Sequence, residues 1–297
     1  MSSGGRTRSA SPFTPLLERL EQSRVLDAPG KAVGRSVRGR ISAGPLKDAL
    51  SGTWLGHPLH PLLTDVTIGS FVSASLLDVL GGDSDGRAAE RLLAIGLASA
   101  APTALSGVSD WTDSELGDER VRRVGLVHAA VNDAALVLFA ASLVARRRGN
   151  RGRGKALGLA GGATLGLGGY LGAHLSFFRG VGPNRTAFDE GPKEWTAVAG
   201  AAEVVDGEPT AVVAGDTPVL LVRHGGEVHA LHDRCSHRGC PLSKGSFEGE
   251  TVTCFCHGSQ FDLRDGSILR GPATAPQPVY EVRERDGRIE LRLPEAP

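Results

Sequence analysis

The four cysteines of this 297-residue chain all fall between residues 235 and 256, and this clustering constrains the fold more than any other feature. The pattern is Cys235-Ser-His237, then sixteen intervening residues, then Cys254-Phe-Cys256-His257. Cysteines confined to one short segment indicate a cofactor site rather than a disulfide framework spread over a secreted fold. The chain must therefore fold so that two loops bring thiols and imidazoles together.

Two thiolates and two imidazoles suit two kinds of metal centre. A [2Fe-2S] cluster with mixed ligation requires this donor set, and tetrahedral zinc accepts it as well. Zinc fingers space their ligand pairs differently, and they lack the Gly-Ser-Gln-Phe-Asp continuation at residues 258–262. The spacing therefore favours the iron-sulfur cluster over zinc.

Residues 195–297 resemble Rieske proteins. The resemblance rests on the two Cys-His segments, on the residues that follow each of them (238–242 and 258–262), and on a proline-containing segment at 271–278. It implies that Cys235 and Cys254 hold one iron and that His237 and His257 hold the other. It also implies a disulfide between the remaining cysteines, Cys240 and Cys256, as in the quinol-oxidising Rieske proteins of cytochrome bc complexes. The alternative is that these two are buried free thiols.

Two further positions bear on the reduction potential, which for Rieske centres spans roughly −150 to +300 mV. Ser259 matches the family serine whose hydroxyl points at a bridging sulfide and raises the potential. Phe261 stands where high-potential members carry Tyr, so one hydrogen-bond donor is missing. The resemblance thus implies a potential between the two extremes.

The remainder of this C-terminal part has short alternating stretches bounded by Gly, Asp and Pro. Two hairpins are predicted, with turns at 224–227 and 285–288, which indicates a small antiparallel all-β domain. His229 and His232 precede the first cysteine, but their spacing adds no ligand signal. We expect both at the surface.

The other half of the chain is apolar. Four segments approach the length of about 20 residues that a membrane-spanning helix needs, near 61–80, 90–109, 124–145 and 156–178. A soluble helical bundle is the alternative, since the first segment contains Asp65 and Asp78 and the second is rich in Ala and Ser. The predicted fold is therefore an α + β multidomain protein, a four-helix transmembrane bundle followed by a small all-β Rieske domain.

The predicted division is a basic amphipathic N-terminal segment (1–52), a four-span membrane domain (53–180), a linker (181–194) and the Rieske domain (195–297). A basic amphipathic segment beside a membrane lies on the lipid surface, or else packs as a solvated helix on the Rieske domain. Four crossings make a multi-pass protein of the cell membrane. The side that carries the Rieske domain stays undecided, because the arginine-rich loop after the third span and the absence of an export signal point in opposite directions.

The segment from Trp54 to Asp65 resembles the opening of an uncharacterised family of four-span bacterial membrane proteins, a likeness that covers residues 14–180 and implies topology alone. The predicted topology places four histidines on one membrane face, with the Rieske domain: His57, His60, His128 and His174. Three interpretations are open: two histidines hold a haem b, they line a quinone pocket, or they serve helix packing.

Asp65 and Asp133 each follow a histidine by five positions, which hints that the first and third spans are related copies. Such a repeat would place two His and Asp sets across a common axis.

Lys plus Arg and Asp plus Glu both number 33, so net charge gives no argument for a nucleic-acid partner. The predicted function is membrane-bound one-electron transfer through the cluster, from quinol or from a haem in the bundle, to a redox partner protein. The alternative is a membrane-anchored, ferredoxin-like donor to an oxygenase or reductase, in which the helices are only an anchor.

Overall fold

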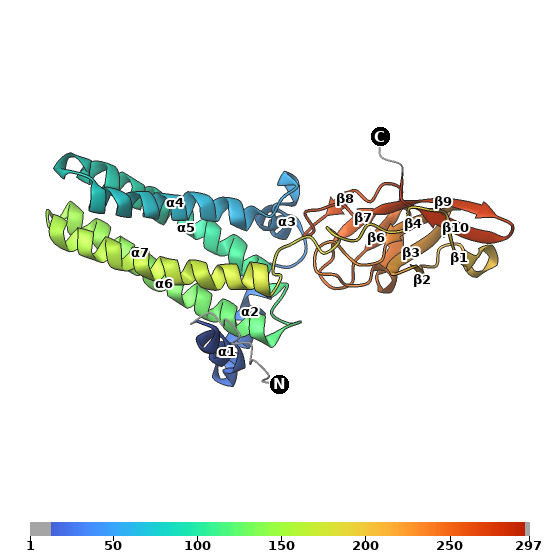
Figure 1. The fold of residues 1–297 in the computed structure, drawn as a ribbon, viewed down its shortest axis with the longest axis horizontal. Coiled ribbons are helices and arrows are strands. Elements are labelled where there is room, and N and C mark those ends of the chain that lie inside the picture. The colour runs from blue at the N-terminus through green and yellow to red at the C-terminus, as the bar shows by residue number, and fades with distance from the viewer. Residues whose placement is uncertain (1–12, 295–297) are drawn as a thin grey trace, which may run out of the picture.

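The computed structural model describes residues 13–294, with a helical part at one end of an elongated molecule and a β domain at the other (Figure 1). The first twelve residues of the expected basic N-terminal segment lie outside the described residues. The helices are α1 (Thr14–Gln22), α2 (Asp27–Arg38), α3 (Pro45–Ser51), α4 (Leu59–Leu80), α5 (Gly86–Thr112), α6 (Glu119–Arg147) and α7 (Arg151–Ala173). A π-helical turn, η4 (His174–Phe178), extends α7, and residues 179–195 connect it to the β domain.

The four long helices form a bundle of two hairpins, α4 with α5 and α6 with α7. The rings of Phe71 and Phe139 stack in its centre with their centroids 3.9 Å apart. Both rings are fully buried, and they pack with Ala74, Leu93 and Ala135. The hairpins are thus joined through an apolar core.

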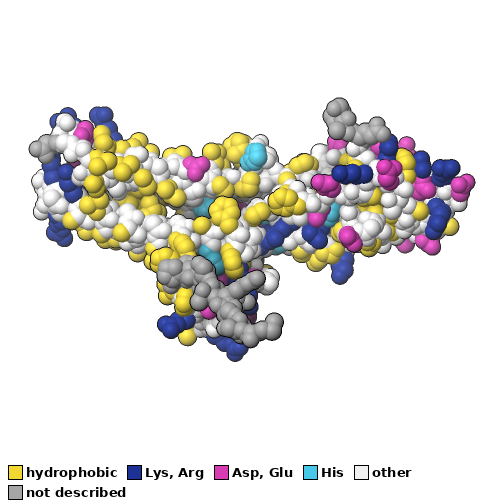
Figure 2. Space-filling model, in the orientation of Figure 1, with side chains coloured by type: hydrophobic (Ala, Val, Ile, Leu, Met, Phe, Trp, Pro, Cys, Tyr) yellow, Lys and Arg dark blue, Asp and Glu magenta, His cyan; other side chains and the backbone are white. Residues whose placement is uncertain are grey.

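Among the described residues, three helices are long and apolar enough to cross a membrane, α4, α5 and α6, rather than the four that the sequence predicted. The exception is α7. Its buried residues are mainly glycines, and Arg151, Arg153 and Lys155 occupy its first turn and a half. Glycine adds little hydropathy but lets two helices approach closely, so α7 belongs to the bundle by packing and not by apolarity. The end of the bundle that lies away from the β domain is charged, and between this end and the β domain the bundle face in Figure 2 carries few charged side chains.

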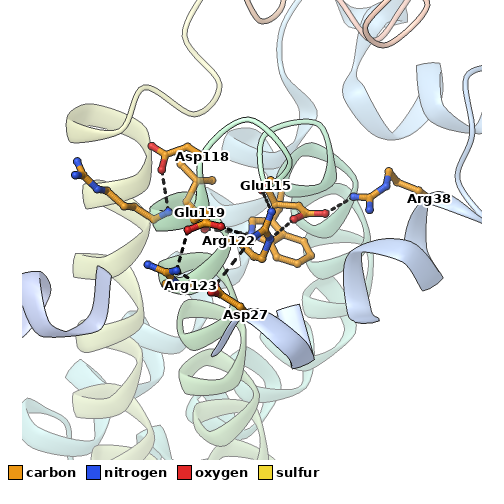
Figure 3. Close-up of polar contacts among 10 residues, drawn as sticks. Asp27, Arg38, Glu115, Asp118, Glu119, Arg122 and Arg123 are labelled. Carbon is orange, nitrogen blue, oxygen red and sulfur yellow. Dashed lines mark hydrogen bonds and ion pairs between the residues drawn. The ribbon is translucent and has the colours of Figure 1, made fainter. Parts of the chain in front are cut away.

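The N-terminal helix α1 packs on α6, and α2 packs on α5 and α6. Figure 3 shows the polar network that holds α2. Glu115 is fully buried, and it accepts hydrogen bonds from Arg38 of α2 and from Arg122 of α6 (Nε to Oε2, 2.5 Å). Arg123 binds Asp27 at the start of α2 (Nε to Oδ1, 2.7 Å). The basic segment is therefore tied to the bundle by partly buried ion pairs.

The β domain contains two antiparallel sheets, as the predicted α + β layout requires. The larger has the order β1-β10-β9-β4-β3-β2, and the smaller β5-β6-β7-β8. The strands are β1 (Thr196–Gly200), β2 (Thr210–Ala214), β3 (Thr217–His224), β4 (Glu227–His232), β5 (Ser246–Glu248), β6 (Thr251–Thr253), β7 (Gln260–Asp262), β8 (Ile268–Arg270), β9 (Val279–Arg285) and β10 (Arg288–Arg292). Both predicted hairpins are confirmed, β3 with β4 through Gly225-Gly226 and β9 with β10 through Asp286-Gly287. These four turn residues have positive φ, which suits the turn between two paired strands.

Candidate metal centre

Two loops of the same construction leave the two sheets, the first (residues 235–240) after β4 and the second (254–259) after β6. In the first, Cys235 N donates to Cys240 O (2.9 Å) and Gly239 N donates to Cys235 O (2.8 Å). In the second, Cys254 N donates to Ser259 O (2.8 Å) and Gly258 N donates to Cys254 O (3.0 Å). Both glycines have φ near +80°, a conformation that other residues adopt only with strain. Each loop therefore turns its Cys and His side chains toward the other loop.

The structure brings all four predicted ligand residues together. The thiols of Cys235 and Cys254 are buried and share a hydrogen bond, which raises the pKa of Cys235 and lowers that of Cys254 to about 7. The rings of His237 and His257 lie with their centroids 5.0 Å apart and nearly perpendicular. Burial lowers the pKa of both imidazoles, that of His257 to about 4, so both are neutral at pH 7 and offer a lone pair. Two thiols beside two neutral imidazoles fit the mixed donor set of a Rieske cluster.

Cys240 and Cys256 form the disulfide that the resemblance implied, and it joins the two loops with a Cα–Cα distance of 6.5 Å. The sulfur of Cys254 lies within 4.8 Å of both disulfide sulfurs. A disulfide sulfur carries no thiolate charge for a metal, so two thiols remain as ligands. This arrangement disfavours a zinc site with three or four cysteines.

The proline-containing segment at 271–278 closes a third side. Ser236 of the first loop donates to it twice, from N to Gln277 Oε1 (3.0 Å) and from Oγ to Ala275 O (2.8 Å). Ala273 N donates to the hydroxyl of Ser259 in the second loop (3.0 Å), and Ser259 is fully buried. Gln277 could not be identified from the sequence, because a lone amide between two prolines carries no metal or charge signal. Its side chain ties this segment to the first loop.

The surface position predicted for His232 is wrong. Its side chain is fully buried at the end of β4, where Nδ1 accepts a hydrogen bond from Arg234 N (3.0 Å). His229 lies earlier in β4 and is half-buried. A histidine at the end of a central strand is covered by the turn that follows it, a contact that local spacing does not reveal.

The histidine edge of the centre faces the helical bundle. His237 Nε2 lies 3.3 Å from Asp113 Oδ2, directly after α5, and Lys47 of α3 binds the same carboxylate (Nζ to Oδ2, 2.7 Å). Burial would raise the pKa of Asp113, but the hydrogen bond with His237 and the charge of Lys47 hold it below its usual range. Neither Asp113 nor Lys47 could be identified from the sequence, since both are far from the cysteines along the chain.

The four membrane-half histidines do not form one site. His57 is exposed, and His174 binds Glu21 of α1 (Nε2 to Oε1, 2.8 Å). His60 and His128 lie inside the bundle, where each Nδ1 donates to a carbonyl of the neighbouring helix. The acceptors are Thr103 O (3.0 Å) and Gly168 O (2.9 Å). The predicted cluster of four thus reduces to the pair His60 and His128.

This pair occupies equivalent positions in two similar hairpins. The ring of His60 in α4 lies against Gly107 of α5, and the ring of Phe71 lies against Gly96. Each contact is so close that a Cβ on the glycine would approach the ring to 2.6 Å. The second hairpin repeats this arrangement with the same eleven-residue spacing, through His128 and Phe139 against Gly172 and Gly161 (3.0 Å for each Cβ).

The equivalent Phe71 and Phe139 stack on each other, and the equivalent Asp78 and Arg146 form an ion pair. The hairpins are therefore related by an approximate two-fold axis. Asp65 and Asp133 are equivalent too, but both face outward and so lie apart from the histidines.

Each of the two parts of the chain matches a known protein family. Residues 194–281 match the family described as Rieske [2Fe-2S] domain, and residues 56–185 match the family described as Predicted membrane protein (DUF2231). The C-terminal part of the chain therefore contains a Rieske [2Fe-2S] domain, and the helical part is similar to that membrane-protein family.

The Rieske part is similar to ferredoxin subunits of dioxygenases. It is 38% identical over 100 residues to the anthranilate 1,2-dioxygenase ferredoxin subunit of Burkholderia cepacia, which covers 34% of this chain and 93% of the relative. It is 41% identical over 97 residues to the 3-phenylpropionate/cinnamic acid dioxygenase ferredoxin subunit of Escherichia coli (strain K12). This match covers 32% of this chain and 90% of the relative. Among solved structures, the ferredoxin of carbazole 1,9a-dioxygenase from Nocardioides aromaticivorans IC177 matches with 29% identity and a TM-score of 0.33, over 34% of this chain and all of that one.

Proposed function

We propose that this protein is a membrane-anchored one-electron carrier in which Cys235, His237, Cys254 and His257 hold a [2Fe-2S] cluster. The observation that carries this proposal is the convergence of these four side chains from two loops of identical construction. The domain that contains them is similar, over nearly the whole length of each relative, to proteins named as ferredoxin subunits.

When bound, the cluster accepts and releases one electron, and its neutral imidazole ligands make it less negative than an all-thiolate cluster. The protein's part is to hold and shield it. The disulfide between Cys240 and Cys256 braces the two loops, and the segment 271–278 excludes water from the third side. The Ser259 hydroxyl already accepts a hydrogen bond from Ala273 N, so its own proton is free to donate to a cluster sulfide and raise the potential.

The proposed partner is an oxygenase or reductase that takes one electron at a time. The relatives support this class of partner, because both are named as ferredoxin subunits of dioxygenases. The helical domain anchors the Rieske domain as a multi-pass bundle of the cell membrane, with α4, α5 and α6 supplying the apolar spans and α7 packed among them through glycine. An even number of crossings keeps α1, α2 and the Rieske domain on one side.

Purified full-length protein in detergent tests the proposal. It should contain about two iron and two acid-labile sulfide per chain, and its reduced form should give the EPR signal of mixed imidazole and thiolate ligation. Cys235→Ser should abolish both, whereas His229→Asn, a histidine of β4 outside the loops, should retain them. A wild-type chain that binds zinc instead of iron, or a His229→Asn variant that loses the cluster, would contradict the proposal.

Electron supply through the bundle is a second candidate, with a haem b or a quinone between the hairpins. The observation that favours it is the pair His60 and His128, which flank the pseudo-two-fold axis, each with Nδ1 fixed by a backbone carbonyl. Metal-ligating histidines have this arrangement, in which the second nitrogen is left for the metal; His128 Nε2 would exchange its contact with Asn132 Nδ2 (3.2 Å) for it. Protein expressed with ample haem should show a Soret band that His60→Ala and His128→Ala remove. Absence of the band rules out haem, and absence of quinol-dependent reduction of the cluster rules out quinone.

A further inference from the structure

The helical domain covers the histidine edge of the candidate metal centre. Asp113, which follows α5, places Oδ2 3.3 Å from His237 Nε2, and the two side chains are 8% and 16% exposed. α3 lies where the bundle meets the β domain (Figure 1). The edge through which electrons would enter or leave the cluster is therefore in contact with this chain's own helices.

Asp113 is held rigidly by Lys47. Lys47 is only 3% exposed; its ammonium binds Asp113 (2.7 Å) and donates to both O and Oγ of Ser109 in α5 (2.8 and 2.9 Å). The ammonium thus makes two hydrogen bonds to Ser109 and one ion pair with Asp113, all within the helical domain. A buried lysine with this coordination fixes the position of the carboxylate, so the contact with His237 does not depend on a mobile surface side chain.

The contact extends over the loops and the segment that enclose the centre. Thr53 Oγ1 donates to Ala273 O in the segment 271–278 (3.3 Å), and a Cβ on Gly271 would lie only 2.0 Å from the same hydroxyl. A Cβ on Gly258 of the second loop would lie 3.2 Å from Ala43 Cβ. Both approaches need glycine in the Rieske domain. The first loop is also tied to the connecting segment, because Arg185 N donates to Ser236 O (2.9 Å).

We propose that the helical domain is a docked partner for the histidine edge of the cluster, and that Asp113 and Lys47 set its reduction potential. This inference rests on the proposed function, since it requires a cluster at His237. A carboxylate that accepts a hydrogen bond from the free nitrogen of a ligand imidazole makes that imidazole a stronger electron donor. Reduction adds negative charge beside this carboxylate, so Asp113 favours the oxidised cluster, and the positive charge of Lys47 favours the reduced one.

The two charges therefore predict shifts of opposite sign. In redox titrations of the full-length protein in detergent, followed by EPR, Asp113→Asn should raise the midpoint potential and Lys47→Gln should lower it. For each variant we expect the ratio of reduced to oxidised cluster at fixed potential to change about tenfold, which is about 59 mV for one electron. Asp216→Asn removes an exposed carboxylate from the turn between β2 and β3 and should leave the potential unchanged.

The possible outcomes separate the two proposals. If the wild type has no cluster, the proposed function is wrong and this inference falls with it. If the cluster is present but both variants keep the wild-type potential, or both shift it in the same direction, the docking inference is wrong and the proposed function stands. If the Asp113→Asn variant does not assemble its cluster, the Lys47→Gln variant decides alone. A midpoint potential below the wild-type value then supports the docking inference, and the wild-type value overturns it.

Discussion

Removal of the disulfide between Cys240 and Cys256 should destabilise the Rieske domain by an amount that follows from the length of the loop it closes. The two cysteines are 16 residues apart. A crosslink across a loop of this size lowers the chain entropy of the unfolded state by the equivalent of about 3 kcal/mol at 25 °C. Serine has nearly the same shape as cysteine, so the Cys240→Ser/Cys256→Ser double variant should lose about this amount without a large cavity.

Urea unfolding of the full-length protein in detergent, followed by the visible absorption of the cluster, measures the loss. With a urea dependence of about 2 kcal/mol per molar, the midpoint should fall by about 1.5 M. The two single variants are the control. Since one crosslink needs both sulfurs, Cys240→Ser, Cys256→Ser and the double variant should have the same midpoint. Midpoints equal to the wild type, or losses that add in the double variant, would refute the reasoning.

Glu115→Gln removes a fully buried carboxylate between two arginines, and it should lower the free energy that holds α1 and α2 on the bundle by about 3–5 kcal/mol, measured as faster proteolysis of these helices. Glu119→Gln is the control: this side chain is 59% exposed, so its loss should lower the same free energy by under about 1 kcal/mol. Equal effects of the two variants would refute the role of the network. Burial would raise the pKa of Glu21, but hydrogen bonds from Arg179 and His174 hold it below its ordinary value. Its contribution to stability is thus present above the unfolded-state pKa and lost as pH falls through the folded-state pKa. The protection factors of the α1 amides, which correct for the pH dependence of intrinsic exchange, should stay constant from pH 8 to about 5 and fall only below about 4; a fall near pH 6 would contradict this. Phe261→Tyr adds a donor beside the buried cysteines and should raise the cluster potential, and a fall or no change in redox titration would contradict it.

The centre could be predicted from the sequence because its signals are local. Each loop carries its cysteine, its histidine and the glycine that turns the chain within a few residues, and the hairpins are marked by Gly225-Gly226 and Asp286-Gly287. The helices of the membrane half were harder to predict, since the apolarity of a segment reflects its transfer to lipid and not its packing against other helices. In α7 the buried residues are mainly glycines, so its low hydropathy does not reveal how closely this helix packs in the bundle.

The contacts around the histidine edge could not be predicted, for a different reason. Lys47, Asp113 and His237 come from three distant parts of the chain, and only the relative position of two folded domains brings them together. Ionisable residues near a span end are common, and nothing in their own sequence distinguishes these two from solvated ones. The burial of His232 is likewise a consequence of tertiary packing that alternation within one strand does not encode.

The approximate two-fold axis of the bundle has an evolutionary consequence. A single ancestral hairpin could have built the same four helices as a homodimer, which would place Phe against Phe on the axis, as Phe71 and Phe139 still lie. Strict symmetry would also oppose two identical residues where Asp78 now meets Arg146. Gene duplication and fusion removes that restriction, since the two copies can then diverge into opposite charges. Fusion also allows the four-helix bundle to carry a single Rieske domain. A homodimer of hairpins, each joined to its own Rieske domain, would carry two.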